Sequence, residues 1–185
     1  FRRRIFDLRT NRPADRLFPY RTSMFGTGAN NAFRTEALQS IGGFDPVLGP
    51  ATAATAGEDL DVYYRIIDAG YQLVYQPSAF VRHRHRSDYE ALSHQFYTYG
   101  MGLAAYMTKV VTRNPLDGLR IIARMPAVIA FARAEAVPDT APDFPYPAAL
   151  TAVEWKGRLY GPVGYARSRW QHRRELRLQR LRSRV

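Results

Sequence analysis

Residues 57–85 constrain the fold of this chain more than any other stretch. They read GEDLDVYYRIIDAG, then YQLVYQP and SAFVRHRH. Four apolar residues recur at the spacing of one helix face: Leu60, Tyr63, Tyr64 and Ile67. Gly70 is a residue type that commonly follows a helix end. The two segments after it, 71–77 and 78–85, have the composition of short strands. A helix, a glycine and two strands in this order predict an α/β fold.

Further helices are expected on both sides of this segment. Residues 34–45 suggest a short helix with Thr35 as its N-cap, ended by Gly42. Residues 46–57 form a loop of small residues, which suits a mobile segment.

Two longer helical patterns follow. Residues 88–112 have helical spacing, although Gly100 and Gly102 are expected to interrupt it, and Asn114-Pro115 breaks it. Residues 116–136 are amphipathic and carry a proline at position 126, which predicts a kink or a split.

These patterns divide the chain into five segments. We expect a basic connecting segment at 1–21, the main folded part at 22–112, an amphipathic helix suited to a membrane surface at 113–137, a proline-rich linker at 138–150 and a basic C-terminal tail at 151–185. Basic tails of this kind are either solvated or bind an anionic partner, so we expect both ends to lie outside the catalytic part.

Composition excludes several classes of protein. The chain has 185 residues, 46% of them hydrophobic, which is enough for a single domain core. Without cysteine it has no disulfide framework, zinc-thiolate site or Cys nucleophile. No apolar run is long enough to predict a transmembrane helix, and no signal peptide is evident. The lack of an initiator Met suggests a piece of a longer protein.

The net charge of +11 lies at the two ends of the chain. Residues 1–21 contain seven Arg and two Asp, and residues 156–185 contain ten Lys or Arg with Glu175 as the single acid. The middle is therefore mildly acidic. Basic ends can meet nucleic acid, anionic lipid or a nucleotide.

Three acids, Glu58, Asp59 and Asp61, lie in the first turn of the helix at 58–69. Free N–H groups and a partial positive charge at a helix start stabilise ionised carboxylates. The cluster is therefore either ordinary helix-start chemistry or a catalytic site. A loop of small residues before it and a second polar cluster after it favour the catalytic interpretation.

The second polar cluster is VRHRHRSD at residues 81–88. His83 and His85 lie two positions apart, so in a strand they would share one face. Such a pair can bind a metal, or it can be two surface histidines in a basic ribbon.

A glycine-rich stretch, FGTGANNAF, occupies residues 25–33. It lacks the third glycine of a dinucleotide fingerprint and the Gly-Lys-Ser/Thr ending of a P-loop. It is either a tight turn or a backbone segment that approaches a ligand, with Asn30 and Asn31 as amide groups suited to sugar hydroxyls.

Taken in order, GTGANNAFRTEALQSIGGFDPVLG and GEDLDVYYRIIDAGYQLVYQPSAFVRHRHRS resemble family 2 glycosyltransferases. The resemblance covers roughly residues 22–105 and the C-terminal, acceptor-side half of the catalytic domain. It implies a partial GT-A fold, Rossmann-like, followed by helices. It also implies an enzyme that transfers a sugar from a nucleotide-sugar donor to a hydroxyl acceptor with inversion.

The resemblance also assigns roles to residues of this chain. It makes Asp59 the general base and puts Glu58 beside it toward the acceptor, with His83 as the metal or diphosphate ligand and His85 as its alternative. Substrate contacts are expected from Gly28, Ala29, Asn30, Asn31, Asp61 and Arg86. The cofactor is expected to be Mg²⁺ or Mn²⁺, which absorbs the charge of the leaving diphosphate.

This sequence departs from the family pattern in two respects. No Asp-x-Asp triplet precedes Gly26, so the donor-binding half and most of the cation site are expected outside this chain. The Gln-x-x-Arg-Trp motif is also absent, which favours single or limited additions over polymer synthesis.

The basic ends allow two interpretations, which differ in the partner that they bind. The interpretation that fits the resemblance is a peripheral enzyme at the cytoplasmic face of a membrane, bound to an anionic surface and active in cell-envelope glycan or glycolipid synthesis. Its acceptor would be a glycan, a lipid-linked sugar or a small hydroxyl compound, and no nucleic acid is expected. The alternative is a basic module without catalysis that binds nucleic acid or a membrane surface.

Overall fold

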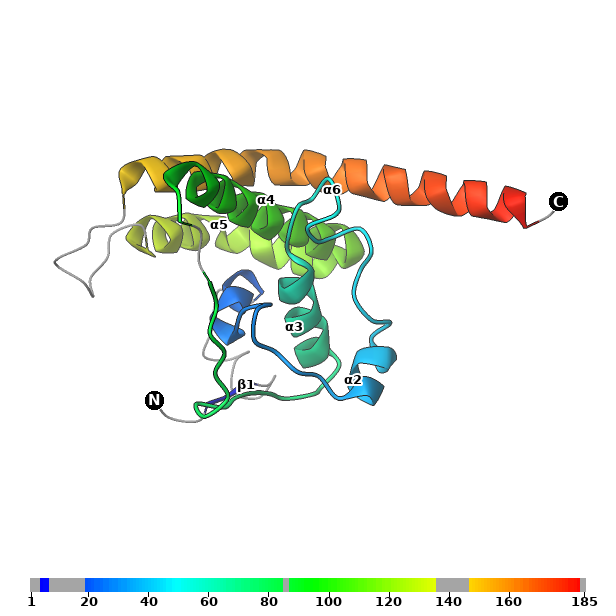
Figure 1. Ribbon diagram of the computed structural model, residues 1–185, viewed down its shortest axis with the longest axis horizontal. Coiled ribbons are helices and arrows are strands. Elements are labelled where there is room, and N and C mark those ends of the chain that lie inside the picture. Colours follow the sequence, from blue (N-terminus) through cyan, green and yellow to red (C-terminus); the bar gives the residue numbers. More distant parts are fainter. Residues whose placement is uncertain (1–3, 7–18, 85–86, 136–146, 184–185) are drawn as a thin grey trace.

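The computed structural model of the chain describes residues 4–6, 19–84, 87–135 and 147–183. Their elements, in order, are β1 (Arg4–Phe6), the 3-10 helix η1 (Tyr20–Phe25), α2 (Thr35–Ser40), α3 (Glu58–Asp68), β2 (Leu73–Tyr75), α4 (Tyr89–Arg113), α5 (Pro115–Glu135) and α6 (Ala148–Arg182). Figure 1 shows the long helices α4, α5 and α6 together on one side, α2 and β1 on the opposite side, and α3, with η1 next to it, between them. The described part is thus mostly helical, with two short strands.

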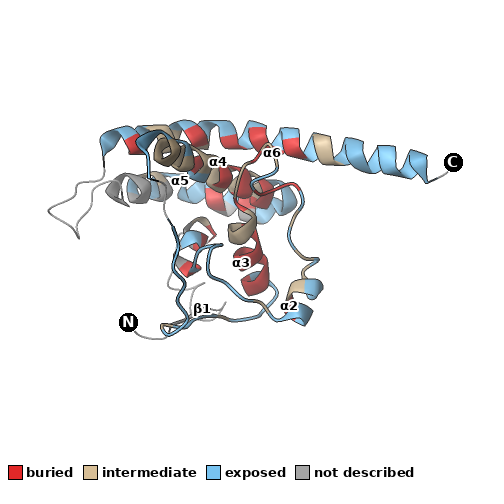
Figure 2. Ribbon diagram, viewed as in Figure 1, coloured by how far each residue is buried: buried red, intermediate tan, exposed pale blue. Residues whose placement is uncertain are grey.

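Helix α3 is the centre of the fold. Its seven consecutive residues from Asp61 to Ile67 are all buried, which is expected of a helix packed on several sides (Figure 2). Its residues enter three hydrophobic clusters: Tyr64 with Tyr106, Val110 and Ile121; Val62 and Ile66 with Ala37; Tyr63 and Ile67 with Phe25. The helix therefore joins the layer of long helices to the smaller elements.

The start of α3 is fixed by a close backbone contact with α4. Gly57, the N-cap of α3, has a φ of 96°, and a Cβ at this position would lie 2.5 Å from the carbonyl oxygen of Gly102. Only glycine allows both the left-handed backbone and the close approach.

Helices α4 and α6 pack together through glycines of both helices. A Cβ on Gly100 would collide with the backbone of Glu154, and one on Gly157 with the backbone of Tyr97. The sequence predicted that Gly100 would interrupt the helix, but α4 is continuous from Tyr89 to Arg113. The reason is that tertiary packing at these glycines outweighs a helix-propensity cost of about 1 kcal/mol each.

Helix α6 crosses the boundary that the sequence suggested between linker and tail. It begins at Ala148 and buries Leu150, Gly157, Gly161, Gly164, Tyr165 and Ser168. Residues 148–168 are therefore part of the fold rather than a solvated tail, whereas residues 173–183 are exposed. Most of the predicted linker, residues 136–146, lies outside the described residues.

The strands also differ from the prediction. β2 pairs antiparallel with β1, with Arg4 opposite Tyr75 and Phe6 opposite Leu73, although the sequence placed residues 4–6 in a connecting segment. The second predicted strand, at 78–85, is not formed over the described residues 78–84. These residues are exposed, and the carbonyl of Ala79 is bound by the Asn30 side chain instead of a neighbouring strand.

Three smaller predictions can be compared with the structure. The N-cap of α2 is Arg34, and Thr35 is its first residue, so the predicted N-cap was wrong by one position. Helix α5 continues through Pro126, so the predicted split is not formed, although proline has no N–H to donate within the helix. Gly70 follows α3 with a φ of 89°, as predicted for a residue after a helix end.

Across the described part of the chain, every helix lacks the combination of length and apolar character that crossing a membrane requires.

Candidate functional site

Asp59 lies in the first turn of α3, where two backbone N–H groups bind its carboxylate. Gly28 donates to Oδ2 at 2.9 Å, and Leu60 donates to Oδ1 at 2.8 Å. The N–H of Leu60 is one of the first-turn donors that have no acceptor within the helix. Each carboxylate oxygen has a further acceptor position, and the side chain is half-buried, so Asp59 can still accept a proton from a ligand.

The glycine-rich loop at 26–31 packs against the Asp59 carboxylate. A Cβ on Gly28 would lie 3.2 Å from Asp59 Oδ2, so a larger residue would push the carboxylate away. Asn31 Nδ2 donates to the carbonyl of Gly28 and to the hydroxyl of Tyr63, both at 3.3 Å. The loop therefore lies directly against α3, with its four predicted substrate residues exposed: Gly28, Ala29, Asn30 and Asn31.

Asn30 connects the loop to the third predicted part of the site. Its Nδ2 donates to the carbonyl of Ala79 at 3.0 Å. Ala79 lies four residues before His83, in the exposed segment after β2. The loop thus contacts the start of α3 through Gly28 and the segment after β2 through the carbonyl of Ala79.

Tyr63 contributes a hydroxyl to this site that the sequence analysis counted only as part of an apolar stripe. Burial raises the pKa of Tyr63 above its ordinary value, and the negative charge of Asp59 raises the pKa further. The hydrogen bond from Asn31 acts in the opposite direction and lowers the pKa by less. Tyr63 is therefore a neutral donor at physiological pH. The signal that could have found it is the spacing of four from Asp59, which puts both on one helix face.

Glu58 has a different environment from Asp59. Burial raises the pKa of Glu58, and the neighbouring charge of Asp59 raises the pKa further. A hydrogen bond from the backbone of Glu58 itself acts in the opposite direction and lowers the pKa by less. Its Oε2 is covered and has no hydrogen-bond partner within the described part of the chain. The carboxyl lies under Gly49, where a Cβ would be 3.5 Å from Glu58 Cδ. Of the two carboxylates, Asp59 is the one open to a ligand.

Asp61 was expected to contact substrate, and the structure contradicts this. Its side chain is 1% exposed and forms ion pairs with Arg65 at 2.5 Å and Lys109 at 2.6 Å. Arg65 also donates to the carbonyls of Ile41 and Gly43. Because it lies two positions after Asp59 on the helix, Asp61 faces α4 instead, and it anchors α3 there.

The loop at 46–57 is held in place rather than free to open. Val47, Leu48 and Ala54 pack with Ala105 and Tyr165. The N–H of Ala54 also donates to Ser168 Oγ at 3.0 Å. Helix α6 therefore supports the loop that leads into the acidic turn of α3.

The predicted metal ligands are only partly described. His83 is exposed, whereas His85 and Arg86 lie outside the described residues. Among the described residues, no three His, Asp or Glu side chains come close enough together to hold a metal ion. The described residues alone therefore do not fit a divalent cation.

Comparisons with known proteins identify the family of this chain. The model of the family described as "Glycosyl transferase family group 2" matches residues 12–153. The chain is also similar to proteins named "Pre-mycofactocin glycosyltransferase" from two strains of Mycobacterium tuberculosis, with 35% identity over 71 residues. That match covers 38% of this chain and 14% of the length of the relatives. No solved structure matches the chain significantly.

Proposed function

The chain belongs to glycosyl transferase family group 2, whose members transfer sugars and have the GT-A nucleotide-sugar transferase fold, and we propose that Asp59 is the general base of an inverting transfer. The donor is a nucleotide-sugar and the acceptor carries a hydroxyl group. The observation that supports this most directly is the Asp59 carboxylate, which two N–H groups fix while an acceptor position stays open on each oxygen.

The transfer of the sugar requires one base, which takes the single proton that the acceptor releases. Asp59 takes the proton of the acceptor hydroxyl while the acceptor oxygen forms a bond to the anomeric carbon. The bond from that carbon to the diphosphate breaks, and the nucleoside diphosphate leaves with the electron pair. The new bond forms on the face opposite the leaving group, so the configuration is inverted.

The residues around Asp59 suit an acceptor. Asn30, Asn31 and the exposed backbone of Gly28 and Ala29 offer amide groups for sugar hydroxyls. Glu58, which holds its proton more readily than an ordinary glutamate, lies beside the base and shapes the acceptor side.

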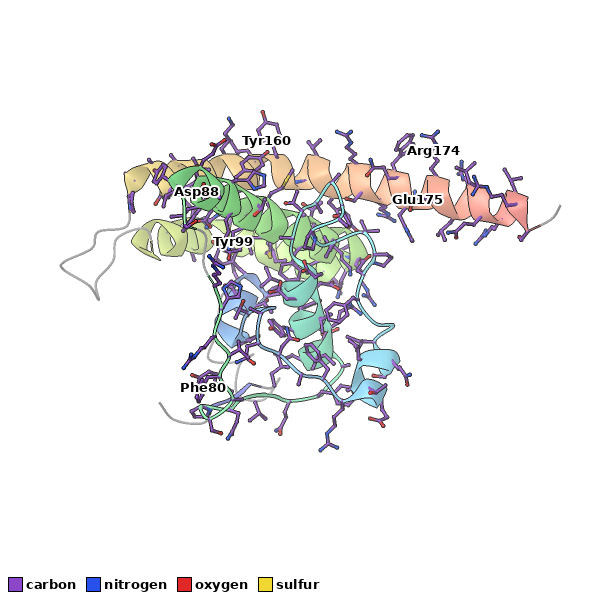
Figure 3. All side chains as sticks on the ribbon, viewed as in Figure 1. Phe80, Asp88, Tyr99, Tyr160, Arg174 and Glu175 are labelled. Atoms are coloured by element: carbon purple, nitrogen blue, oxygen red, sulfur yellow. The ribbon has the colours of Figure 1, made fainter. Side chains whose placement is uncertain are left out.

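Residues 22–112 are proposed to be the acceptor-side half of a GT-A domain. In support, the sheet has two strands within the described residues, and several large apolar side chains in and near β2 are exposed: Tyr71, Val74, Tyr75, Phe80 and Val81. Phe80 is 81% exposed and projects from the molecule near β1 (Figure 3). A donor-binding half that continues the sheet would cover this surface.

That donor half is also where a divalent cation, Mg²⁺ or Mn²⁺, would be held. His83 is proposed to reach the cation or the diphosphate from this side, with His85 as the alternative. The segment that carries His83 lies against the loop at 26–31 through the bond between Asn30 and Ala79, which supports this role.

A membrane surface is proposed as a further partner. Leu116, Leu119 and Ile122 recur every three residues along α5, and each is more than half exposed. Arginines at positions 113 and 124 flank them. Such a helix suits peripheral binding at the cytoplasmic face, which agrees with a role in cell-envelope glycan or glycolipid synthesis.

Steady-state kinetics of Asp59→Asn in the full-length protein test the proposed base. We expect kcat to fall by about 10²–10⁴, because Asn fills the same space but cannot take a proton. Affinity for the nucleotide-sugar, measured separately, should change little. The matched control is Asp68→Asn, which removes an exposed carboxylate from the other end of α3. A near-native kcat for Asp59→Asn would mean that the acids only cap the helix.

A further inference from the structure

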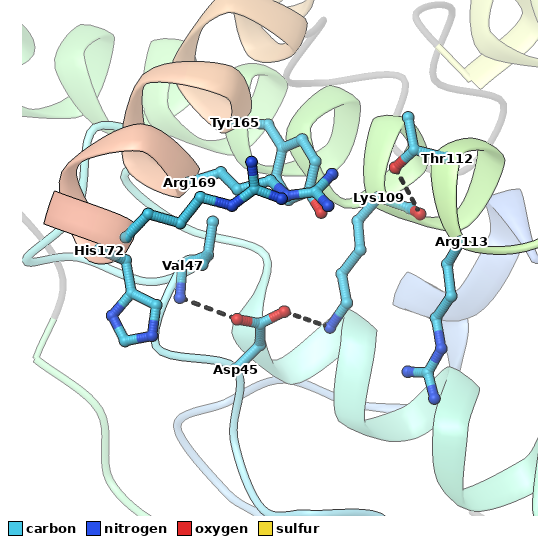
Figure 4. Close-up of a pocket in the computed structure, with 9 residues that line it drawn as sticks. Asp45, Val47, Lys109, Thr112, Arg113, Tyr165, Arg169 and His172 are labelled. Carbon is cyan, nitrogen blue, oxygen red and sulfur yellow. Dashed lines mark hydrogen bonds and ion pairs between the residues drawn. The ribbon is translucent and has the colours of Figure 1, made fainter. Parts of the chain in front are cut away.

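A pocket of about 380 Å³ lies between the C-terminal half of α4 and the middle of α6. Its walls come from Thr112 and Arg113 on α4, from Tyr165, Arg169, His172 and Arg173 on α6, and from the Asp45–Lys109 ion pair (Figure 4). None of the residues assigned to sugar transfer lines it. The volume is within the range of small-molecule sites, about 300–1,000 Å³.

The acids near the pocket are already neutralised. Asp45 and Asp61 both contact Lys109, at 2.5 and 2.6 Å, and Asp61 also contacts Arg65. Two carboxylates are thus matched by two cations. Asp45 cannot offset any further positive charge in the pocket.

Three arginines of the pocket are not neutralised by a carboxylate of the described residues. Arg113, Arg169 and Arg173 form no ion pair with any other residue that the structure describes. Arg169 and Arg173 are four positions apart and lie on one face of α6, where like charges repel. Arg113 approaches from the end of α4, and Figure 4 shows it at the opposite end of the pocket from His172.

We propose that this pocket binds a phosphate-bearing ligand through Arg113, Arg169 and Arg173. A phosphomonoester or diphosphate group carries two to three negative charges, which matches three guanidinium groups that form no ion pair within the described part of the chain. The planar guanidinium donates two parallel hydrogen bonds to phosphate oxygens, so three of them can enclose one such group. The Tyr165 hydroxyl and Thr112 add uncharged polar groups to the wall.

The site is independent of the proposed base, because its residues belong to α4 and α6 rather than to the first turn of α3. It is nevertheless connected to that turn through Lys109, which contacts both the pocket residue Asp45 and the α3 residue Asp61. A bound phosphate group would therefore hold α6 against the part of α4 that anchors α3.

Calorimetric titration of the full-length protein with inorganic pyrophosphate tests the site. The test variant is R169Q/R173Q, and the matched control is R177Q/R180Q, which removes two exposed arginines of the same helix outside the pocket. We expect the dissociation constant to rise at least about tenfold in the test variant and less than about twofold in the control, because charge-assisted hydrogen bonds are lost only in the first. Thermal unfolding, measured alongside, should stay unaltered in both double variants, because all four arginines are exposed.

A second arm identifies the source of the phosphate group. Vesicles of phosphatidylcholine containing phosphatidic acid present a phosphomonoester on a lipid, and pyrophosphate presents a free diphosphate group. Arg177 and Arg180 also attract an anionic vesicle, so the comparison is between the two double variants. A greater loss of binding in R169Q/R173Q than in R177Q/R180Q, in either arm, supports the site and names its source. Equal loss in both double variants in both arms, unchanged affinity of R169Q/R173Q for both probes, or no binding of either probe overturns the proposal, because the attraction would then be non-specific charge, another site or absent.

Discussion

At the scale of single residues, a buried set of four charges holds the site together. Asp61 and Lys109 are 1% and 9% exposed, and each has two ionic partners. Removing one member leaves another charge buried without full compensation, which costs far more than an exposed ion pair contributes. The acid that the sequence suggested for substrate binding thus supports Asp59 from two positions away.

Asp45→Asn should therefore destabilise the fold in a pH-dependent way. Burial acts to raise the pKa of Asp45, but the hydrogen bond from Lys109, the N–H of Val47 and the charges of Lys109 and Arg65 outweigh it, so the pKa lies below its ordinary value. A lowered pKa adds stability above the ordinary pKa of aspartate, and that stability is lost as the pH falls. We expect a deficit of about 1–3 kcal/mol at pH 7 that shrinks toward pH 3.

Urea unfolding of this variant at several pH values measures the deficit. Glu36→Gln, which removes an exposed carboxylate on α2, is the control and should show little change at any pH. A deficit for Asp45→Asn that stays constant with pH would show that the ion pair with Lys109 adds nothing beyond packing.

At the scale of elements, the contact of α4 with α6 depends on the absence of side chains. Gly157 and Gly161 are one helical turn apart on α6, and Cβ atoms there would collide with Tyr97, Met101 and Ala104 of α4. Gly164 continues the contact to the loop before α3, where a Cβ would lie 2.8 Å from the carbonyl of Ala53. The same helix surface thus positions α4 and that loop.

Gly157→Ala should destabilise the protein by about 1–3 kcal/mol, although alanine is the better helix former. The added methyl group would meet the backbone of Tyr97 and Met101, which cannot move aside as a flexible side chain can. Thermal unfolding measures the effect. Ala166→Leu, an enlargement at an exposed position of α6, is the control and should change the midpoint little. A stabilised Gly157→Ala variant would mean that the two helices pack less closely than described.

At the scale of the whole molecule, α6 has two parts with different roles. Residues 148–168 pack on α4 and on the loop at 46–57, whereas residues 173–183 are exposed and extend away from the other elements (Figure 1). The expectation that the whole basic end is peripheral therefore applies only to the second part. Deleting residues 156–185 would remove buried contacts of α6 with α4 as well as charge.

A shorter deletion, of residues 174–185, should separate charge from folding. It removes five Arg and one Glu but keeps the pocket arginines. We expect the thermal midpoint to stay nearly unchanged and binding to anionic vesicles to weaken about tenfold or more, since each Arg near such a surface contributes about 1 kcal/mol. Cosedimentation with anionic and with zwitterionic vesicles checks this. If the shortened protein keeps its vesicle affinity, this segment has no role at the membrane.

The sequence by itself determined the features that depend on neighbouring residues. The periodicity of residues 58–68 predicts α3, Gly70 its end, and Asn114-Pro115 the break between α4 and α5, because helix spacing, left-handed glycines and the missing proline N–H act locally. The ordered motifs also indicated the family correctly, since each is a short stretch.

Only the tertiary structure decided which polar residues meet. Asp59 and Asp61 look equivalent in the sequence, yet one lies under an exposed glycine loop and the other is buried against Lys109, 48 positions along the chain. The pairing of β1 with β2, the packing of α6 on α4 and the arginine pocket likewise join segments far apart in sequence. Their free energy comes from burial and from charges brought together across the fold, and no local pattern records which distant residue supplies the other half of such a contact.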